Sequence, residues 1–280
     1  MKPLAEQTVL ITGSTDGLGR ALAVELAHDG ARLLLHGRDA GRLRDTEAEI
    51  RDHAWDTDLD TYVADFSNLD DVRNLAEQIT GDHDRLDVLV NNAGIGTNLP
   101  GDGARMESRD GYELRFAVNY LAHFLLTRSL LPLLVGSAPA RIVNVSSAGQ
   151  APIDFDDVML ERDYSGIQAY CQSKLAQVMF TFDLADELDP DAVTANSLHP
   201  ATYMPTKIVA AAGVRPASSL EEGVAATLRL VADPDLHGVT GRYFDRQRES
   251  RAHPQADDAG ARRRLRELSE RLVQQPAPQP

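Results

Sequence analysis

Short apolar runs of strand length alternate with helical patterns along most of the chain. The runs are nearly free of polar residues and cover 9–11, 32–36, 61–64, 88–90, 142–145 and 193–198. The segments between them follow helical spacing and cover 18–28, 41–53, 69–79, 112–134 and 170–188. Strands without a polar face are typical of a parallel sheet that is covered on both sides. The pattern therefore predicts an α/β fold with a single doubly wound parallel sheet and helices on both faces.

The alternation continues without a break that would separate two domains. Residues 94–103 contain four glycines and a proline, and we interpret them as a loop because the helical pattern resumes directly afterwards. Leu265, Leu268 and Leu272 have the spacing of an amphipathic helix that packs on the domain. We therefore predict one domain over 1–273, followed by a disordered tail of Gln, Pro and Ala over 274–280.

Acidic side chains outnumber basic ones, 43 against 28, which gives a formal net charge of −15. Nucleic acids and anionic membranes need a basic binding face, so neither partner is expected. The most apolar stretch, 116–135, is interrupted by polar residues and a proline, and we expect no membrane span there. The single cysteine, Cys171, excludes an internal disulfide and a cysteine-based metal site. The composition thus predicts a soluble, cytoplasmic protein without a metal ion.

Three glycines follow the first predicted strand and lead directly into a helix, in the order Thr-Gly-Ser-Thr-Asp-Gly-Leu-Gly over 12–19. Glycines at such a turn let the backbone approach a diphosphate, and the helix N-terminus directs N–H groups at it. The spacing G-x-x-x-G-x-G differs from the G-x-G-x-x-G of the most common dinucleotide-binding fold. An ordinary glycine-rich turn is the alternative interpretation, so this motif alone does not establish a cofactor site.

The end of the second predicted strand bears on the choice of cofactor. A site that prefers NAD places a carboxylate on the adenosine ribose there, whereas a site that prefers NADP places an arginine on the 2′-phosphate. Arg38 has the reach and the forked geometry to hold a phosphate, although it could also be a solvated surface charge. Asp39 could contact the ribose, but we favour its interpretation as the N-cap of the following helix.

Tyr170 and Lys174 are four residues apart and therefore lie on the same face of a predicted helix. A tyrosine can act as an acid toward a carbonyl at neutral pH only if its pKa falls, and a nearby cation favours the phenolate. Lysine occurs only at positions 2, 174 and 207, so this spacing rarely arises by chance. A surface tyrosine beside an unrelated lysine is the alternative.

Taken together and in this order, the motifs resemble the short-chain dehydrogenase/reductase family, whose fold is of the Rossmann type. The match spans nearly the whole chain and comprises the glycine-rich turn, Asp65, the Asn-Asn-Ala-Gly sequence of 91–94, Asn119, Ser146-Ser147, Tyr170-x-x-x-Lys174 and His199-Pro200. Considered alone, 91–94 would fit a structural role as well as a ligand contact. Segments 143–147, 169–176 and 265–270 are similar to the retinol dehydrogenase-like branch of the family.

The resemblance implies four catalytic residues. Tyr170 would exchange a proton with the substrate oxygen, and Lys174 would lower the pKa of Tyr170 and hold the nicotinamide ribose. Ser147 would donate a hydrogen bond to the substrate carbonyl. Ser146 is its rival, but the family's catalytic serine is usually the second of the pair. Asn119 would hold a water that links Lys174 to solvent; a buried structural amide is the alternative.

The resemblance also implies which residues contact the cofactor, for which we expect NADP(H) to be preferred and NAD(H) to be possible. They lie in the glycine-rich turn, at the ends of strands and on the catalytic helix, and comprise Gly13, Ser14, Thr15, Gly17, Leu18, Gly19, Arg38, Asp65, Asn92, Ala93, Gly94, Tyr170, Lys174, Pro200 and Thr202. The family's usual Pro-Gly is Pro200-Ala201 here. This difference weakens the transfer of nicotinamide contacts to Thr202 and Thr206, of which Thr202 is the safer choice.

We therefore expect an NADP(H)-dependent enzyme that interconverts a carbonyl and an alcohol of a small molecule by hydride transfer. An NAD-dependent alcohol dehydrogenase on the same fold and a dinucleotide-binding sensor without turnover are the alternatives, but a sensor has no need for all four catalytic residues.

The resemblance leaves the substrate and the assembly open. The 22 residues of 148–169 are more than the family commonly has between its serine and its tyrosine, and they alter the pocket wall. A membrane anchor is frequent in the retinol dehydrogenase-like branch, but we expect none from the residues before Val9, so the resemblance does not imply retinol as the substrate. Family members commonly pair through the helices that correspond to 112–134 and 170–188, and a homo-oligomer is a further expectation.

Overall fold

One eight-stranded sheet with the order β3-β2-β1-β4-β5-β6-β7-β8 forms the centre of the computed structural model, which describes residues 2–98 and 104–275. Strands β1 to β7 are parallel to one another, and β8 is an edge strand antiparallel to β7. The strands are β1 (Thr8–Thr12), β2 (Arg32–Gly37), β3 (Leu59–Val63), β4 (Val88–Asn91), β5 (Ala140–Val145), β6 (Val193–His199), β7 (Arg242–Asp245) and β8 (Arg248–Ser250).

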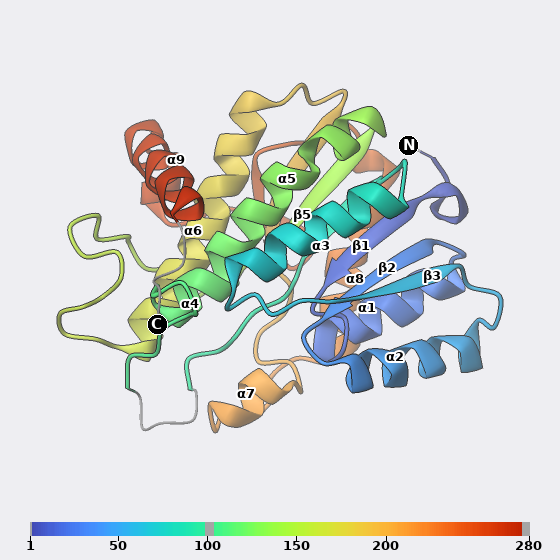
Figure 1. Ribbon diagram of the computed structural model, residues 1–280, viewed down its shortest axis with the longest axis horizontal. Helices are drawn as coiled ribbons and strands as arrows, with labels where there is room; N and C mark the ends of the chain where they lie inside the picture. The colour runs from blue at the N-terminus through green and yellow to red at the C-terminus, as the bar shows by residue number, and fades with distance from the viewer. Residues whose placement is uncertain (1, 99–103, 276–280) are drawn as a thin grey trace.

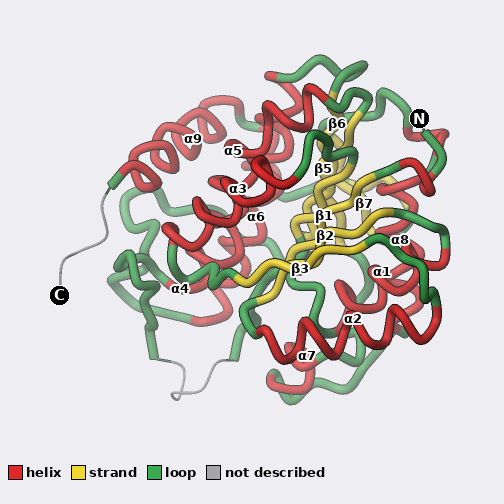
Figure 2. The backbone as a smooth tube through the Cα atoms, turned by 45° about the vertical axis from the view of Figure 1, so that its right-hand side comes forward, coloured by secondary structure: helices red, strands yellow, loops and turns green. Residues whose placement is uncertain are grey.

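Helices cover both faces of this sheet (Figures 1 and 2). One face carries α3 (Leu69–Asp82), α5 (Ala122–Gly136) and α6 (Gly166–Glu187), with α9 (Ala259–Gln274) packed outside α6. The other face carries α1 (Gly17–His28), α2 (Ala40–His53) and α8 (Leu220–Ala232). The short helices α4 (Leu114–Phe116) and α7 (Lys207–Ala211) lie near the carboxyl ends of the strands (Figure 1).

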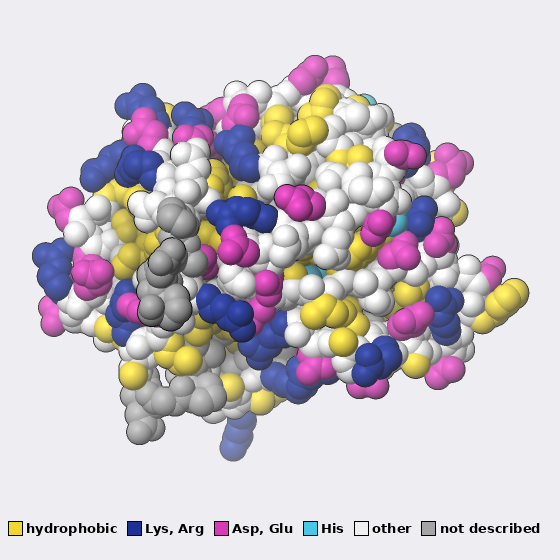
Figure 3. Space-filling model, viewed as in Figure 1, with side chains coloured by type: hydrophobic (Ala, Val, Ile, Leu, Met, Phe, Trp, Pro, Cys, Tyr) yellow, Lys and Arg dark blue, Asp and Glu magenta, His cyan; other side chains and the backbone are white. Residues whose placement is uncertain are grey.

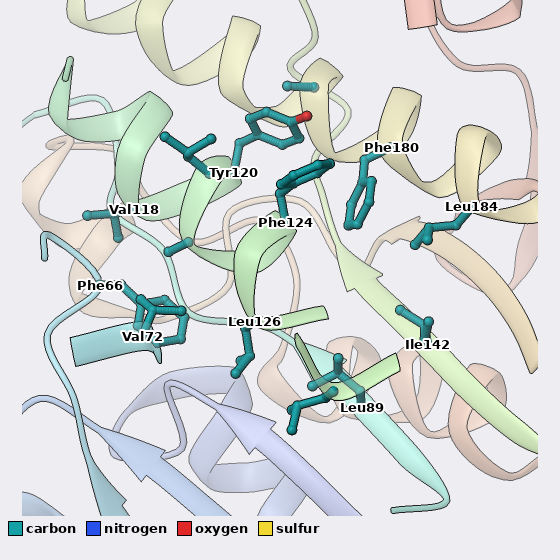
Figure 4. Close-up of a cluster of buried hydrophobic side chains, with 14 of the residues drawn as sticks. Phe66, Val72, Leu89, Val118, Tyr120, Phe124, Leu126, Ile142, Phe180 and Leu184 are labelled. Carbon is teal, nitrogen blue, oxygen red and sulfur yellow. The ribbon is translucent and has the colours of Figure 1, made fainter. Parts of the chain in front are cut away.

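The strands lack a polar face because their side chains alternate between two buried clusters. In β1, Leu10 belongs to the cluster beneath α3, α5 and α6, whereas Val9 and Ile11 belong to the cluster beneath α1, α2 and α8. Figure 4 shows the first cluster, in which Tyr120, Phe124 and Phe180 pack ring against ring above the sheet. Each fully buried side chain of this size contributes about 1.5–3 kcal/mol to stability. Burial of side chains on both faces therefore stabilises the sheet in this arrangement.

Charged side chains of both signs are interspersed on the face shown in Figure 3. Several form ion pairs between neighbouring elements, such as Arg128 of α5 with Glu187 of α6, 2.7 Å apart, and Arg32 of β2 with Asp60 of β3, 3.2 Å apart. Exposed pairs of this kind contribute at most about 1 kcal/mol each. The fold therefore depends mainly on the two apolar clusters.

The predicted doubly wound α/β fold is confirmed, with two differences. The strands β7 and β8 were not predicted. β7 has only two buried residues between two charged ones, and β8 is three residues long, polar and exposed, so neither gives an apolar run. The single helix predicted over 112–134 is divided into α4, a π-helical segment (Ala117–Leu121) and α5. The π-helical segment widens the helix where Asn119 lies.

Two predicted irregular segments lie partly outside the described residues. The described part of the loop predicted over 94–103, residues 94–98, has no helix or strand. Of the tail predicted over 274–280, Gln274 ends α9 and Gln275 follows it in extended conformation. The remaining residues of both predictions, 99–103 and 276–280, are not described.

Leu114–Gly136 is long and apolar enough, by length and composition, to cross a membrane, with a mean hydropathy of 1.3 over its best window. The polar residues and the proline in this stretch therefore do not by themselves exclude a span. In the fold, 61% of that window is buried, and α5 packs against α3, β4 and β5. The helix serves as a core element here. A cytoplasmic location without membrane contact remains a sequence-based prediction.

Candidate active site

The glycine-rich turn between β1 and α1 is fitted closely to the end of β4. Gly13 has φ +68°, and a Cβ atom there would lie 2.8 Å from the Cα of Ala93. A side chain on Gly19 would collide with the carbonyl of Gly13, so the first turn of α1 packs directly on the turn before it. The Asn92 amide donates to the carbonyls of Thr12 and Gly13 at 2.9 and 3.1 Å. Backbone contact this close requires glycine.

Asp16 caps the N-terminus of α1, since its carboxylate accepts a hydrogen bond from the N–H of Gly17 at 2.9 Å. Two cations compensate this charge: Lys207 of α7 at 2.6 Å and Arg42 of α2 at 3.8 Å. Our sequence analysis missed all three residues. The position of Asp16 just before a predicted helix could have identified it as a cap. Its partners, Lys207 and Arg42, could not be identified because they come from helices far away in the sequence.

At the end of β2, Asp39 and Arg38 have different environments. The Asp39 carboxylate caps α2 by accepting from the N–H of Arg42 at 3.0 Å, and this hydrogen bond lowers the pKa of Asp39. This agrees with the interpretation as a helix cap. Arg38 is exposed and makes neither a hydrogen bond nor an ion pair with the residues that the structure describes. Its guanidinium is therefore available to an anion beside the glycine-rich turn.

The four predicted catalytic residues come from three segments and meet at the carboxyl end of the sheet. Tyr170 and Lys174 lie on α6, with the Lys174 Nζ 5.8 Å from the centre of the Tyr170 ring. Ser147 follows β5 directly and lies beside the Tyr170 ring, since a Cβ on Gly149 would be 3.5 Å from the Ser147 Oγ and 3.9 Å from the Tyr170 Cε1. Asn119 lies in the π-helical segment. A Cβ on Gly94 would be 3.2 Å from the Asn119 Oδ1 and 3.7 Å from the Lys174 Nζ.

The two serines after β5 have separate tasks. Ser146 is buried, and its hydroxyl donates to the main-chain carbonyl of Lys174 at 2.8 Å. Ser147 is partly exposed and faces the Tyr170 hydroxyl. This arrangement supports Ser147, because Ser146 is already engaged in holding α6 against β5.

Burial shifts the pKa values of Tyr170 and Lys174 in opposite directions. It raises the pKa of Tyr170, an effect that the hydrogen bond with Ser147 partly offsets, and it lowers the pKa of Lys174 to about 7. The expected lowering of the Tyr170 pKa by Lys174 is therefore absent from this structure. The ammonium group instead donates to the carbonyls of Val145, at 3.0 Å, and Gln177, at 2.9 Å.

Asn119 is fully buried, and its side chain holds the segment after β4. The amide nitrogen donates to the Ile95 carbonyl at 3.1 Å and to the Ser173 hydroxyl at 3.0 Å, while its oxygen accepts from the Ile95 N–H at 2.8 Å. Its main-chain carbonyl lies 2.9 Å from the Nδ1 of His123. These contacts support the structural alternative for Asn119, because its side chain connects the loop after β4 with α6.

The remaining predicted cofactor residues surround this centre. The Ser14 hydroxyl donates to the carbonyl of His36 at 3.1 Å, and the Asp65 carboxylate accepts from the N–H of Ser67 at 2.9 Å. Thr202, after Pro200, lies with its hydroxyl 3.0 Å from the Nε2 of His199. Of the other predicted residues of the turn, Thr15 precedes the N-cap of α1, and Gly17 and Leu18 begin the helix.

A buried arginine joins three segments beside the site. The Arg115 guanidinium donates to the carbonyls of Gly96, at 2.9 Å, and Thr97, at 2.6 Å, in the loop after β4. It also binds the hydroxyl of Tyr164, from the segment before α6, and lies 3.4 Å from the carboxylate of Glu113. The Tyr164 hydroxyl is 3.0 Å from the same carboxylate. We call these five residues the Arg115 clamp.

Replacing Arg115 by methionine should lower the free energy of unfolding by about 3–5 kcal/mol, because the buried Glu113 carboxylate would lose its counterion. Chemical denaturation measures this loss. The matched control is Arg51→Met, which removes an exposed ion pair with Glu47 on α2 and should cost less than about 1 kcal/mol. Equal losses in the two variants would contradict the assigned role of the clamp.

The residues present fit a nicotinamide dinucleotide. The glycine-rich turn leads directly into the N-terminus of α1, Arg38 is exposed at the end of β2, and Gly94 leaves space beside Lys174. In an open parallel α/β sheet, ligands bind at the carboxyl ends of the strands, which is where these groups gather.

Comparisons with known proteins agree with this geometry. A family model described as short chain dehydrogenase matches residues 7–215. Retinol dehydrogenase 14 of Mus musculus is 37% identical over 291 residues, which cover 95% of this chain and 86% of that protein. An uncharacterised protein of Mycobacterium paratuberculosis has a solved structure with a TM-score of 0.79 and 29% identity, and the match covers 100% of this chain and 97% of that one. A short-chain dehydrogenase of Escherichia coli CFT073, complexed with NADPH, has a TM-score of 0.72 and 28% identity, with coverages of 88% and 98%. This chain therefore belongs to the short-chain dehydrogenase family, in its retinol dehydrogenase-like branch.

Proposed function

We propose that this oxidoreductase interconverts a carbonyl and an alcohol with NADP(H), and that Tyr170 is the proton donor and acceptor. The observation that carries the proposal is the convergence of Tyr170, Ser147, Lys174 and Asn119 beside Gly94. The exposed guanidinium of Arg38, which has no partner among the described residues, supports the choice of NADP(H). The bound NADPH in the similar structure from Escherichia coli also supports that choice.

When bound, the cofactor supplies or accepts the hydride; the residues of this chain bind, orient and move the proton. Ser147 and Tyr170 direct two hydroxyl groups at one position, where the substrate oxygen would lie. During reduction the Tyr170 phenol gives its proton to that oxygen, while the Ser147 hydroxyl donates a hydrogen bond to it. Lys174 would provide a positive charge near the nicotinamide ribose, and Asn119 keeps the loop after β4 in place.

A panel of aldehydes, ketones and alcohols, including retinal, assayed with NADPH and NADH, tests the proposal. The segments that would select the substrate are 94–98, 148–165 and 203–219, which are mostly loops around the site. We expect turnover of at least one carbonyl compound with NADPH preferred. An NAD-dependent alcohol dehydrogenase would instead prefer NADH. A sensor would bind the cofactor and turn over no compound of the panel.

The pH dependence should differ between the two directions of the reaction. Since burial raises the pKa of Tyr170, the phenol keeps its proton at neutral pH. Reduction, which needs the phenol, should therefore be favoured near neutrality and slow as pH rises through that pKa. Oxidation needs the phenolate and should accelerate over the same range.

Loss of the Lys174 charge above a pKa of about 7 should slow both directions and can thus be separated from the effect of Tyr170. Profiles of kcat/KM against pH in the two directions, recorded where chemistry limits the rate, make this comparison. Parallel profiles throughout would contradict a shared proton on Tyr170.

A further inference from the structure

A second buried polar layer lies directly behind the four proposed catalytic residues. Gln177 follows Lys174 by less than one turn of α6 and is only 1% exposed. Its Oε1 accepts a hydrogen bond from the Lys174 Nζ at 2.9 Å, and its Nε2 lies 3.3 Å from the Nδ1 of His123 on α5. The opposite orientation of the amide would place its N–H groups against the ammonium donors. The contact with Lys174 therefore fixes which way this side chain points.

His123 extends this layer toward the glycine-rich turn. Its Nδ1 lies 2.9 Å from the main-chain carbonyl of Asn119, and its Nε2 lies 3.3 Å from the Thr12 hydroxyl. Burial lowers the pKa of His123 to about 3, so the ring is neutral and carries one proton. The shorter contact assigns that proton to Nδ1, which donates to the main-chain carbonyl of Asn119, so the Gln177 amide nitrogen packs against this N–H without a hydrogen bond to it. The Thr12 hydroxyl is equally far, 3.3 Å, from Nε2 and from the Val90 carbonyl. Thr12 in turn accepts from the N–H of Ala93 at 3.0 Å.

We propose that Gln177 is a positioning residue for the reaction, which holds the Lys174 ammonium through its amide oxygen while the neighbouring His123 holds the main chain of Asn119. The inference rests on the function proposed above, because it assumes that the charge and position of Lys174 matter for turnover. It adds Gln177 and His123 to the residues that organise the site, and neither needs to touch substrate or cofactor.

The surroundings of Lys174 explain why one neutral acceptor is important. The titratable groups that face the Lys174 ammonium are Tyr170 on the same helix and His123 on α5. Neither carries a negative charge, because Tyr170 keeps its proton and the His123 ring is neutral. The segment after β4 contributes Gly94, β5 contributes the Val145 carbonyl and the π-helical segment contributes the Asn119 amide, and none of these groups carries a charge. In the described part of the chain no carboxylate forms an ion pair with Lys174. Its charge therefore depends on the acceptors of Val145 and Gln177, and removing one disfavours the ammonium form.

Three lysines in the whole chain allow a direct measurement. NMR of protein labelled with ¹³C at the lysine ε-carbon should show resonances of Lys2, Lys174 and Lys207, and the variant Lys174→Arg assigns the buried one. In Gln177→Leu we expect the pKa of Lys174 to fall by about one pH unit or more, as loss of a hydrogen bond to a charged group implies. In Gln177→Glu, which keeps the size and adds a negative charge, the pKa should rise. NADPH affinity, followed by its fluorescence, should fall several-fold in Gln177→Leu.

Gln172 provides the matched control. It lies on the same helix and is equally buried, but its amide donates to the Val158 carbonyl at 2.7 Å and does not contact Lys174. Gln172→Leu should leave the Lys174 titration unchanged. A wild-type titration in both Gln177→Leu and Gln177→Glu overturns the inference, and Gln177→Glu alone decides it if the leucine variant does not fold. Undiminished turnover in Lys174→Ala would instead overturn the proposed function, so the two failures are distinguishable.

Discussion

Replacing Tyr170 by phenylalanine should reduce turnover by about 10²–10⁴-fold or more while changing NADPH affinity only a few-fold. General acid–base catalysis commonly contributes a factor of this size. The substitution removes one hydroxyl group and keeps the ring that packs beside Lys174. Steady-state rates with a carbonyl substrate, together with fluorescence titration of NADPH, measure the two quantities separately.

Tyr112→Phe is the matched control for this experiment. Its hydroxyl donates to the Leu272 carbonyl at 2.9 Å, away from the site, so its loss should affect stability by about 1 kcal/mol and leave turnover nearly intact. Substantial activity in Tyr170→Phe would show that another group transfers the proton. A large loss of NADPH affinity in that variant would mean that the phenol also serves the cofactor.

Arg38→Ala should weaken NADPH much more than NADH, and wild-type protein should prefer NADPH by roughly 10- to 100-fold. Arg38 is exposed beside the glycine-rich turn, and the residues before it in β2 offer no carboxylate that would repel a 2′-phosphate. The Asp39 carboxylate is engaged at the start of α2, 3.0 Å from the Arg42 N–H. The measurement is the ratio of kcat/KM values with the two cofactors, in the wild type and in the variant.

Two further variants separate the contribution of Arg38 from general electrostatics. Arg51→Ala removes a positive charge from the far end of α2 and should leave the cofactor ratio unchanged. Asp39→Ala should leave NADPH binding unharmed or improve it, since it removes a negative charge next to the phosphate position. A wild-type preference for NADH, or equal losses with both cofactors in Arg38→Ala, would show that Arg38 is only a surface charge.

The sequence predicted the elements whose side chains are buried on both sides. Apolar runs such as 9–11 and 88–90 have no other stable placement, and they mark the central strands correctly. The edge strand β8 gave no such signal because its residues are exposed. The π-helical segment around Asn119 was also not predictable, since one extra residue in a helical turn leaves the apolar spacing almost unchanged.

At the site, the sequence identified residue types and spacing but missed what depends on packing. The helical face shared by Tyr170 and Lys174 follows from their separation alone. The direction of the Tyr170 pKa shift does not, because it depends on how deeply α6 is buried and on which acceptors Lys174 finds. His123 follows Asn119 by four residues and Gln177 follows Lys174 by three, so each pair shares a helical face, and this spacing was visible in the sequence. Only the fold shows that the two pairs meet.

The Arg115 clamp has a consequence for altering the substrate preference of this enzyme. The obvious approach is to graft the segment between Ser147 and α6 from a relative. Such a graft replaces Tyr164, which contacts Arg115 and Glu113, and so disturbs the loop at Gly96 that the same guanidinium holds. A transplanted segment should therefore keep a tyrosine at this position, or be exchanged together with 95–97 and 113–115. A redesign should therefore transfer three segments together, namely the segment before α6, 95–97 and 113–115, because the buried Arg115 side chain connects them.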